Sequence, residues 1–477
     1  MLLEMNKALI CDYNNLIMAN AYYKSGKYSE KAYFDAFFRR VPDGGGYIIF
    51  SGLESIIDFV KKMKFDETAI KQLKQIGDFD FEFLNYLRKF KFSGDIYAVP
   101  EGTPVFPNEP VITVYAPIIE ALLLETYILI SINHQSSIST KASRITRAAD
   151  GRHIIDFSAR KSHGIHAAYN GARAAYIGGF NTTNNTLAIV DSGIPHTGHM
   201  SHSWVQMFDN EYEAFKKYCE LCPETPELLV DTYNVLTSGI PNAIKVITEY
   251  LIPQGKNNYS IRLDSGDITY LSKKARKLLD DAGLYECKIT ASNQLDEYII
   301  RDILLQGAKI DNFIVGEHLT KINKDSSMGA VYKLVAVEKN NEIVPKIKRS
   351  ENASKIPNPH YKKFYRLFDN ESSKAIADLL CVYDEAINPN NPLVIFDSDF
   401  TWKQKTLVDF TTVDMQKTIF KEGKCIYKTP DASEIREYCK EQTELLWDEV
   451  KRFENPHNYY IDLSRRLWNI KNALLKM

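Results

Sequence analysis

Between about residues 150 and 335, short apolar segments, polar turns and helical stretches follow one another in a repeated order, and this order constrains the fold most strongly. Asp267 is typical of a helix cap and Gly283 of a helix stop, while Pro241 suits a first helical turn. A series of five or more such units predicts a parallel sheet that closes, or nearly closes, into a barrel. The expected strands are 153–158, 197–200, 227–233, 259–265, 288–293 and 310–316.

The part of the chain before residue 119 has a different texture. Residues 51–92 have apolar positions at helical spacing, and residues 93–118 alternate Pro, Gly and Asn with short Val-, Ile- and Tyr-rich runs, which predicts antiparallel strands. The apolar stretch 116–132 carries Glu120 and Glu125, so it predicts a core helix and no membrane span.

Composition narrows the class of protein. With 477 residues, 44% of them hydrophobic and 25% charged, the chain is expected to form two or three globular domains. A net charge of −2 argues against nucleic acid as a partner. Seven scattered cysteines form no disulfide framework, and the start of the chain lacks the features of a secretory signal, so we expect a cytoplasmic protein without a membrane partner.

Polar and charged residues follow almost every expected strand, where a barrel would bring them to one mouth. Any one of the carboxylates could simply cap a helix, but packing alone does not require polar residues in every turn. The set comprises Arg160, Lys161, His199, His202, Asp231, Asn234, Arg262, Asp264, Asp267, Ser292, Asn293 and Gly316.

The chemistry of this set favours a sugar phosphate as substrate. Arg160, Lys161 and Arg262 suit an anion with more than one phosphate. The carboxylates of Asp231, Asp264 and Asp267 suit Mg²⁺ or ribose hydroxyls, and the chain has no GxxxxGK[ST] phosphate loop.

Three histidines, His196, His199 and His202, recur at intervals of three residues. This spacing could bind zinc on a helix, but Pro195 and Gly198 argue against a regular helix there. The histidines could also be satisfied structural residues. The remaining interpretation, which we favour, is a nucleophilic or acid–base histidine at a barrel turn.

Several long strings resemble the nicotinate phosphoribosyltransferases, and together they cover essentially the whole chain. The strings are FFRRVPDGGGYIIFSGLE (37–54), EGTPVFPNEP (101–110), INHQSSISTKASRI (132–145), LVDTYNVLTSGIPNAIKV, IRLDSGDITYLSKKARKLLDDAG, ASNQLDEYIIRDILLQGAKID, GAVYKLVAVE and LWDEVKRFENPHNYY (446–460).

The resemblance implies an α/β fold: an irregular (β/α) barrel of the type II phosphoribosyltransferase kind packed against an α/β sandwich domain. The corresponding boundaries are 1–130 for the sandwich, which part of the C-terminal region is expected to complete, 131–345 for the barrel and 346–477 for a C-terminal region that packs on both. It also implies a homodimer with shared active sites. The implied reaction joins nicotinate to 5-phosphoribosyl-1-pyrophosphate, giving nicotinate mononucleotide and pyrophosphate in NAD salvage, with Mg²⁺ as cofactor and ATP as co-substrate.

Roles for individual residues follow from the same resemblance. His202 would be phosphorylated, and His202 with Asp264 would be catalytic. Phe157 would stack on the pyridine ring, and Arg39 would reach the phosphates of a neighbouring subunit's site. The other implied substrate contacts are Arg160 and Lys161 for pyrophosphate, Arg262 with Asp264 for base and ribose, Ser292, Asn293 and Gly316 for the 5′-phosphate, and Tyr13, Asn14, Thr183, Asn184, Asp231, Asn234 and Asp267.

Departures from the family pattern cluster around the base. Asn14 stands where the family's TDxY motif has a stacking Tyr, with Tyr13 beside it; Ser158 and Lys161 alter EFGxRR, and His199 replaces the Thr of GTxAH. The Asn184 side chain could form a hydrogen bond with either a carboxylate or an amide group on the base. Two alternatives therefore stay open: a divergent paralogue that uses another aromatic base, for example nicotinamide, and a non-catalytic ligand-binding dimer.

Overall fold

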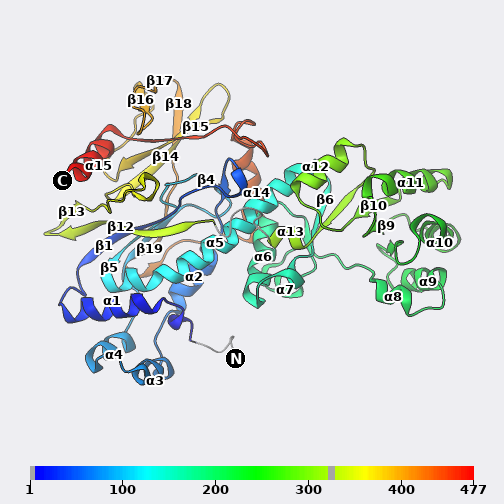
Figure 1. The fold of residues 1–477 in the computed structure, drawn as a ribbon, viewed down its shortest axis with the longest axis horizontal. Helices are drawn as coiled ribbons and strands as arrows, with labels where there is room; N and C mark the ends of the chain where they lie inside the picture. The colour runs from blue at the N-terminus through cyan, green and yellow to red at the C-terminus, as the bar shows by residue number, and fades with distance from the viewer. Residues whose placement is uncertain (1–5, 321–327) are drawn as a thin grey trace. The chain divides into compact units, whose positions relative to one another are not determined.

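The computed structural model describes residues 6–320 and 328–477, and the chain divides into two compact units. Unit 1 comprises Met1–Thr140 and Asn323–Met477, and unit 2 comprises Lys141–Ile322. Figure 1 shows the elements of both units along the chain.

Unit 1 contains a seven-stranded antiparallel sheet in the order β13-β12-β1-β5-β3-β19-β20. Strand β1 pairs with β12 on one side and β5 on the other, so residues some 300 positions apart in sequence become neighbours. The strands are β1 (Lys31–Phe38), β3 (Asp95–Ala98), β5 (Ile112–Pro117), β12 (Ala330–Lys339), β13 (Glu342–Pro345), β19 (Lys417–Lys421) and β20 (Lys424–Cys425).

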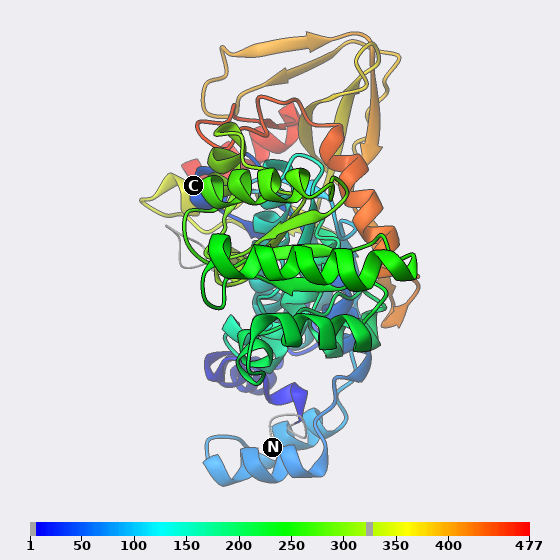
Figure 2. The same ribbon diagram turned by 90° about the vertical axis from the view of Figure 1, so that its right-hand side faces the viewer.

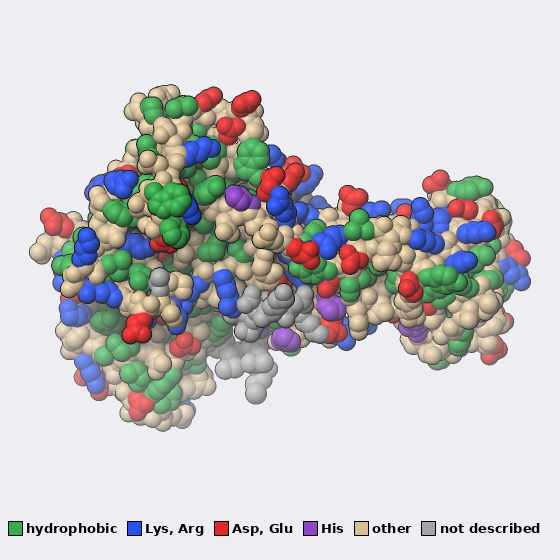
Figure 3. Space-filling model, turned by 45° about the horizontal axis from the view of Figure 1, so that its top comes forward, with side chains coloured by type: hydrophobic (Ala, Val, Ile, Leu, Met, Phe, Trp, Pro, Cys, Tyr) green, Lys and Arg blue, Asp and Glu red, His purple; other side chains and the backbone are tan. Residues whose placement is uncertain are grey.

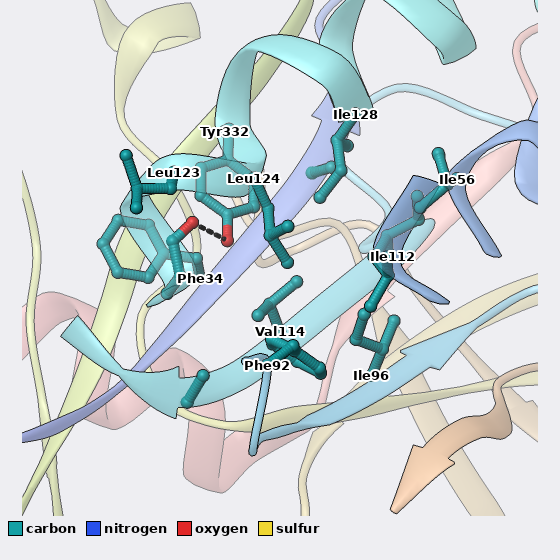
Figure 4. Packing of buried hydrophobic residues seen from close by; sticks show 14 of the residues in the cluster. Phe34, Ile56, Phe92, Ile96, Ile112, Val114, Leu123, Leu124, Ile128 and Tyr332 are labelled. Atoms are coloured by element: carbon teal, nitrogen blue, oxygen red, sulfur yellow. Dashed lines mark hydrogen bonds between the residues drawn. The ribbon is translucent and has the colours of Figure 1, made fainter. Parts of the chain in front are cut away.

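A long helix, α5 (Ile118–Ala148), packs on this sheet. Its first turns carry Leu123, Leu124 and Ile128, which lie over Val114 and its neighbours in a close-packed core (Figure 4). The Tyr332 hydroxyl donates to the Ala121 carbonyl at 3.0 Å and so pins β12 to the helix.

The second half of α5 is polar yet buried, because its hydroxyls bond a neighbouring backbone segment. Thr140 Oγ1 accepts from the Ile49 amide at 2.9 Å, Ser139 Oγ donates to the Ile49 carbonyl at 3.0 Å, and Ser136 Oγ accepts from the Ser51 amide at 3.0 Å. The hydroxyl side chains of the string INHQSSISTKASRI (132–145) therefore stabilise the fold here.

The rest of unit 1 comprises a four-stranded sheet in the order β18-β14-β15-β21, two short two-stranded sheets and several helices. These strands are β2 (Ile48–Ile49), β4 (Pro104–Val105), β14 (Lys362–Asp369), β15 (Ala375–Val382), β16 (Leu393–Phe396), β17 (Gln404–Leu407), β18 (Phe410–Asp414) and β21 (Tyr460–Leu463). The helices are α1 (Tyr13–Lys24), α2 (Leu53–Lys62), α3 (Glu67–Ile76), α4 (Phe81–Arg88), α14 (Ala432–Glu444) and α15 (Arg465–Lys476).

Unit 2 is built on a parallel sheet of six strands in the order β7-β6-β11-β10-β9-β8. Helices follow the strands, and Figure 2 shows the green helices of this unit lying side by side. The strands are β6 (His153–Asp156), β7 (Thr182–Thr183), β8 (Glu227–Leu229), β9 (Ser260–Leu263), β10 (Lys288–Ala291) and β11 (Asn312–Val315). The helices are α6 (Ile165–Ile177), α7 (Thr186–Ser192), α8 (His202–Gln206), α9 (Glu211–Leu221), α10 (Ile240–Val246), α11 (Ile268–Asp281), α12 (Glu297–Leu305) and α13 (Glu317–Thr320).

The parallel α/β sheet predicted from the sequence is confirmed, but one predicted strand is wrong. Residues 197–200 form no strand; the sixth strand is β7, which pairs with β6. The segment from 193 to 201 is held instead by an isolated bridge between Thr183 and His196. The helix expected to open near Pro241 is preceded by a π-helical turn at Val235–Gly239.

The unit boundaries differ from the predicted domain boundaries at 130/131 and 345/346. Helix α5 continues unbroken from Ile118 to Ala148, and the boundary falls inside it. Strands β12 and β13 pair in the antiparallel sheet of unit 1, and residues after 345 belong to that same unit.

Acidic and basic side chains are interspersed on the face drawn in Figure 3. Among the described residues, no helix combines the length and the apolar character that crossing a bilayer requires.

Candidate active site

The carboxyl ends of the parallel strands of unit 2 present the polar turns that the sequence singled out. In a parallel sheet these ends lie along one edge, where α/β proteins bind ligands. Strands β6, β8, β9, β10 and β11 end at residues 156, 229, 263, 291 and 315. The predicted site residues of this unit lie within about five residues of those ends or in the 183–202 segment, and Arg262 is the one that lies inside its strand.

His202 is the first residue of α8, and its ring lies between two side chains from neighbouring strand ends. Nδ1 is 3.1 Å from Thr232 Oγ1, and Nε2 is 3.5 Å from Asp264 Oδ2. The His202 side chain is 41% exposed, so a ligand can reach it. A carboxylate beside one ring nitrogen orients the imidazole and favours a proton on that nitrogen, which leaves the other as a nucleophile or base.

Asp231 and Asp264 tie three strand ends together. Asp231 Oδ2 accepts from the Asp264 amide at 3.1 Å and from Ser265 Oγ at 2.6 Å, while Asp264 Oδ1 accepts from the Ser292 hydroxyl. Asp231 Oδ1 is buried, and none of the described residues offers it a hydrogen bond. The two carboxylates are therefore held rigidly, and one oxygen is left for a ligand.

The carboxylate oxygens of Asp231 and Asp264 could bind Mg²⁺ only together with phosphate oxygens of a substrate. Carboxylate oxygens are the hard donors that Mg²⁺ prefers, and the unpartnered Asp231 Oδ1 would accept one contact. In the part of the chain that the structure describes, no three His, Cys, Asp or Glu side chains come together as a metal cage. The zinc interpretation of His196, His199 and His202 therefore does not hold.

Phe157 directly follows β6, and its half-buried ring lies beside the side chains of His199 and Arg160. Its ring meets that of His199 edge-on, with centroids 5.0 Å apart, and the Arg160 guanidinium carbon lies 5.6 Å from its centroid. Arg160 and Lys161 form one short exposed turn at Ala159–Lys161. An aromatic face with cations beside it can hold a flat anionic ring.

Asp156 anchors this turn from below. It is buried, and it accepts from the Ser158 amide and from Thr183 Oγ1, both at 2.8 Å. Burial raises the pKa of Asp156, and the hydrogen bonds from Ser158 and Thr183 offset part of that rise. Thr183, a predicted substrate contact, is thus committed to the scaffold, whereas the neighbouring Asn184 side chain is exposed.

His199 does not meet His202 but pairs with Glu227, a residue that the sequence analysis did not single out. His199 Nδ1 is 2.5 Å from Glu227 Oε1, and Glu227 Oε2 accepts from Thr290 Oγ1 at 2.6 Å. Burial acts to raise the pKa of Glu227, but the bond and charge of His199 and the bond from Thr290 outweigh it and lower that pKa. Glu227 lies four residues before Asp231 in the predicted strand 227–233, and this even spacing, which puts both side chains on one face of a strand, was the available signal.

Arg262 lies within β9, two residues before Asp264 and hence on the same face of the strand. It is buried, and its Nε has no hydrogen-bond partner in the part of the chain that the structure describes. A buried guanidinium nitrogen without a partner is costly unless a ligand completes it.

Several other predicted residues have local structural partners. Asn234 Oδ1 accepts from the Leu236 and Thr237 amides and caps the π-helical turn, and Asp267 Oδ1 accepts from the Tyr270 amide and caps α11. Asn293 is exposed with a φ of 95°, a backbone conformation that is uncommon for any residue but glycine. Gly316 directly follows β11, and a Cβ there would contact the Phe157 carbonyl oxygen at 3.5 Å.

Tyr13, Asn14 and Arg39 belong to unit 1. Tyr13 and Asn14 begin α1, where the exposed Tyr13 hydroxyl donates to Asp78 and Asn14 is exposed. Arg39 directly follows β1, and its buried Nε finds no hydrogen-bond partner within residues 6–320 and 328–477.

Comparison with known proteins places this geometry in a family. The model of the nicotinate phosphoribosyltransferase N-terminal domain matches residues 9–133, and that of the C-terminal domain matches residues 361–471. The chain is 40% identical over 464 residues to a nicotinate phosphoribosyltransferase of Bacillus subtilis, covering 97% of this chain and 94% of that one. It is 31% identical over 527 residues to one of Caenorhabditis elegans, covering 98% and 93%.

A solved structure shows the same fold. The crystal structure of human nicotinic acid phosphoribosyltransferase superposes with a TM-score of 0.84 at 24% identity, covering 97% of this chain and 99% of that one. That identity supports the likeness of fold, and the sequence relatives support the family. The chain belongs to the nicotinate phosphoribosyltransferase family.

Proposed function

We propose that this protein transfers the 5-phosphoribosyl group of 5-phosphoribosyl-1-pyrophosphate to nicotinate, with ATP hydrolysis coupled through a phosphohistidine at His202. The observation that carries the proposal is the accessible His202 imidazole, held between Thr232 and Asp264 at the strand ends of a chain of this family. Nicotinate is favoured over nicotinamide because the matched relatives are named for nicotinate.

The histidine step needs a free ring nitrogen and a fixed ring. Asp264 beside Nε2 favours the tautomer with the proton on Nε2, so Nδ1 carries the lone pair; in that tautomer the Thr232 hydroxyl, 3.1 Å away, donates to Nδ1 and has to turn away before Nδ1 attacks. Nδ1 attacks the γ-phosphorus of ATP; the bond from that phosphorus to the bridging oxygen breaks, the P–N bond forms and ADP leaves. Water later hydrolyses the P–N bond and releases phosphate.

The transfer step joins the ring nitrogen of nicotinate to C1 of the ribose. The C1–O bond to pyrophosphate breaks as the C1–N bond forms, so positive charge grows on the sugar and negative charge on the leaving group. Arg160 and Lys161 are suited to the pyrophosphate, Phe157 to the pyridine ring, and Arg262 with Asp264 to base and ribose. Mg²⁺, bound mainly through the pyrophosphate, would neutralise the leaving group.

The remaining parts of the proposal concern assembly and location. A homodimer with shared active sites would give Tyr13, Asn14 and Arg39 a role at the site of a second copy of the chain. All seven cysteines are free thiols, which supports a cytoplasmic location.

The test uses the purified protein with Mg²⁺, ATP and 5-phosphoribosyl-1-pyrophosphate, and offers nicotinate, nicotinamide or quinolinate separately. We expect nicotinate mononucleotide with ADP from nicotinate alone. Product from nicotinamide alone would support the altered-base alternative, and no product from any base would support a binding protein.

A matched pair of variants tests the phosphohistidine. His202→Ala should abolish labelling by γ-phosphate-labelled ATP, whereas His196→Ala, a change at an exposed histidine of the same segment, should keep it. Undiminished labelling of His202→Ala would refute the assignment.

A further inference from the structure

An open cavity of about 740 Å³ lies in the C-terminal part of unit 1, and none of its lining residues is among the proposed active-site residues. It is lined mostly by β21, by the segment that follows β16 and by the segment around residue 358. Its size is that of a site for a small molecule. The residues that matter for its chemistry are Asn358, Asp397, Asp399, Lys403, Asp462 and Lys471.

Asp462 is the unusual member of this lining. It lies in β21, opposite Leu379 of β15, and is only 5% exposed. Among the described residues, no side chain or backbone group donates a hydrogen bond to its carboxyl, yet the residue lines the cavity. Burial, and then the negative charge of Asp397, raise the pKa of Asp462 to about 6.

The other charges of the cavity already have neighbours of opposite sign. Asp397 Oδ2 is 4.0 Å from Lys403 Nζ, and Asp397 Oδ1 accepts from the Asp399 and Phe400 amides at 2.9 Å. Lys471 donates to Asn358 Oδ1 at 2.8 Å and is attracted by Asp399. Three carboxylates face two lysines, and the unmatched charge is that of Asp462.

The wall around Asp462 is held in place by contacts that do not use its carboxyl. Trp468 Nε1 of α15 donates to the Ser398 carbonyl at 3.0 Å, which fixes the turn that carries Asp397. A buried carboxylate costs free energy unless a donor or a cation completes it. Nothing in the packing of β21 supplies that group, so it has to come from the open cavity, from solvent or from a ligand that displaces the solvent.

We propose that this cavity binds a small organic cation, an amine or guanidinium compound, whose charged group pairs with Asp462. A protein-held metal ion is disfavoured, because no three potential ligand side chains converge in the described part of the chain. An anion is disfavoured by the excess of carboxylates. A guanidinium or ammonium group supplies the donors that the Asp462 carboxyl lacks.

The test is calorimetric titration of the full-length protein with agmatine, which carries a guanidinium and an ammonium group. We expect one saturable site in the wild type and binding at least about tenfold weaker in Asp462→Asn, which keeps the shape but removes the charge. Asp448→Asn is the matched control, because its side chain is 92% exposed and outside the cavity. It should bind agmatine as the wild type does.

A second variant should strengthen agmatine binding instead of weakening it. Lys403→Gln removes an exposed positive charge from the cavity, so it should bind agmatine several-fold more tightly. Equal binding by the wild type and Asp462→Asn would overturn the proposal, as would binding of Mg²⁺ or citrate but not of agmatine or spermidine. Binding is measured without turnover, so the outcome is independent of the proposed catalytic function.

Discussion

A buried cluster of two carboxyl groups and one arginine in unit 1 leads to a sharp prediction about which carboxyl carries the charge. Arg366 is 1% exposed and donates to Asp378 through Nε at 2.9 Å and through Nη2 at 2.6 Å. The Tyr459 hydroxyl also donates to Asp378, at 3.0 Å. Glu109 lies in the same cluster beside Asp378; among the described residues only the Phe106 amide donates to it, and its buried Oε1 has no other partner there.

One guanidinium can neutralise one carboxylate, so the second should stay protonated. Burial, and then the charge of Asp378, raise the pKa of Glu109 well above its ordinary range, although Arg366 acts in the opposite direction. Asp378→Asn removes the carboxylate that accepts from Nε and Nη2 of Arg366. Glu109 can then ionise as a substitute counter-charge, but in the described part of the chain it accepts no hydrogen bond from Arg366, so the change should still cost about 3 kcal/mol of unfolding free energy. Glu109→Gln replaces one neutral group by another and should cost no more than about 1 kcal/mol.

Thermal unfolding followed by tryptophan fluorescence measures this difference, since Trp402, Trp447 and Trp468 lie in unit 1 and only Trp204 lies in unit 2. We expect Asp378→Asn to lower the transition temperature of unit 1 by roughly 5 °C. The control is Asp384→Asn, which breaks the exposed two-bond pair between Asp384 and Arg466 and should cost at most about 1 kcal/mol.

The pH dependence gives an independent check on Glu109. Its folded pKa is raised, so the folded protein keeps a proton that the unfolded chain releases above the ordinary value of 4.5. Wild-type stability should therefore fall, relative to Glu109→Gln, as the pH rises from about 4.5 through the raised pKa. If Glu109→Gln is as destabilising as Asp378→Asn, or if the two pH profiles are parallel, the charge assignment is refuted.

Two further predictions concern unit 2. Phe157→Ala should raise the KM for the base more than the KM for 5-phosphoribosyl-1-pyrophosphate in steady-state kinetics, because its half-buried ring is proposed to stack on the base; equal effects would argue against that contact. Gly239→Ala should destabilise unit 2 by at least about 2 kcal/mol, because the added Cβ would lie 1.9 Å from the Val230 carbonyl oxygen, and a thermal shift equal to that of Gly198→Ala, where nothing lies within 4 Å, would contradict this.

The parallel sheet was predictable because its signals are local. Each apolar run, its following turn and its helix lie within about 30 residues, and a cap such as Asp267 can be recognised from its immediate neighbours. The strand expected at 197–200 shows the limit of such reading. A segment of four residues that contains Gly198 and His199 is too short to show the alternation of apolar and polar residues that marks a strand. Thr182 and Thr183, in contrast, form a strand because they pair with β6.

The antiparallel sheet of unit 1 could not be assembled from the sequence in the same way. Strand β12 joins β1 across some 300 residues, and the buried pair of Lys362 with Asp35, 2.6 Å apart, links equally distant segments. The sequence around each residue does not identify the other: Asp35 is a single charge in an apolar run, and Lys362 stands beside Lys363 with nothing to mark it as the buried lysine. The domain boundary at 345/346 was placed without those pairings, and they are what assign β12 and β13 to unit 1.

The site residues also divide into those that local sequence identifies and those that need the structure. Position after a strand identifies which residues reach the carboxyl edge, and it therefore singles out Asp231, Asp264 and Ser292 without distinguishing their partners. It does not distinguish a side chain that faces a ligand from one that caps a helix. Asn234 and Asp267 both follow strands, as ligand-binding residues would, but their side chains cap helical turns. What distinguishes them is an atom left without a partner. Asp231 Oδ1 and Arg262 Nε are buried and unsatisfied, so they, more than the two helix caps, are the atoms that a substrate would complete.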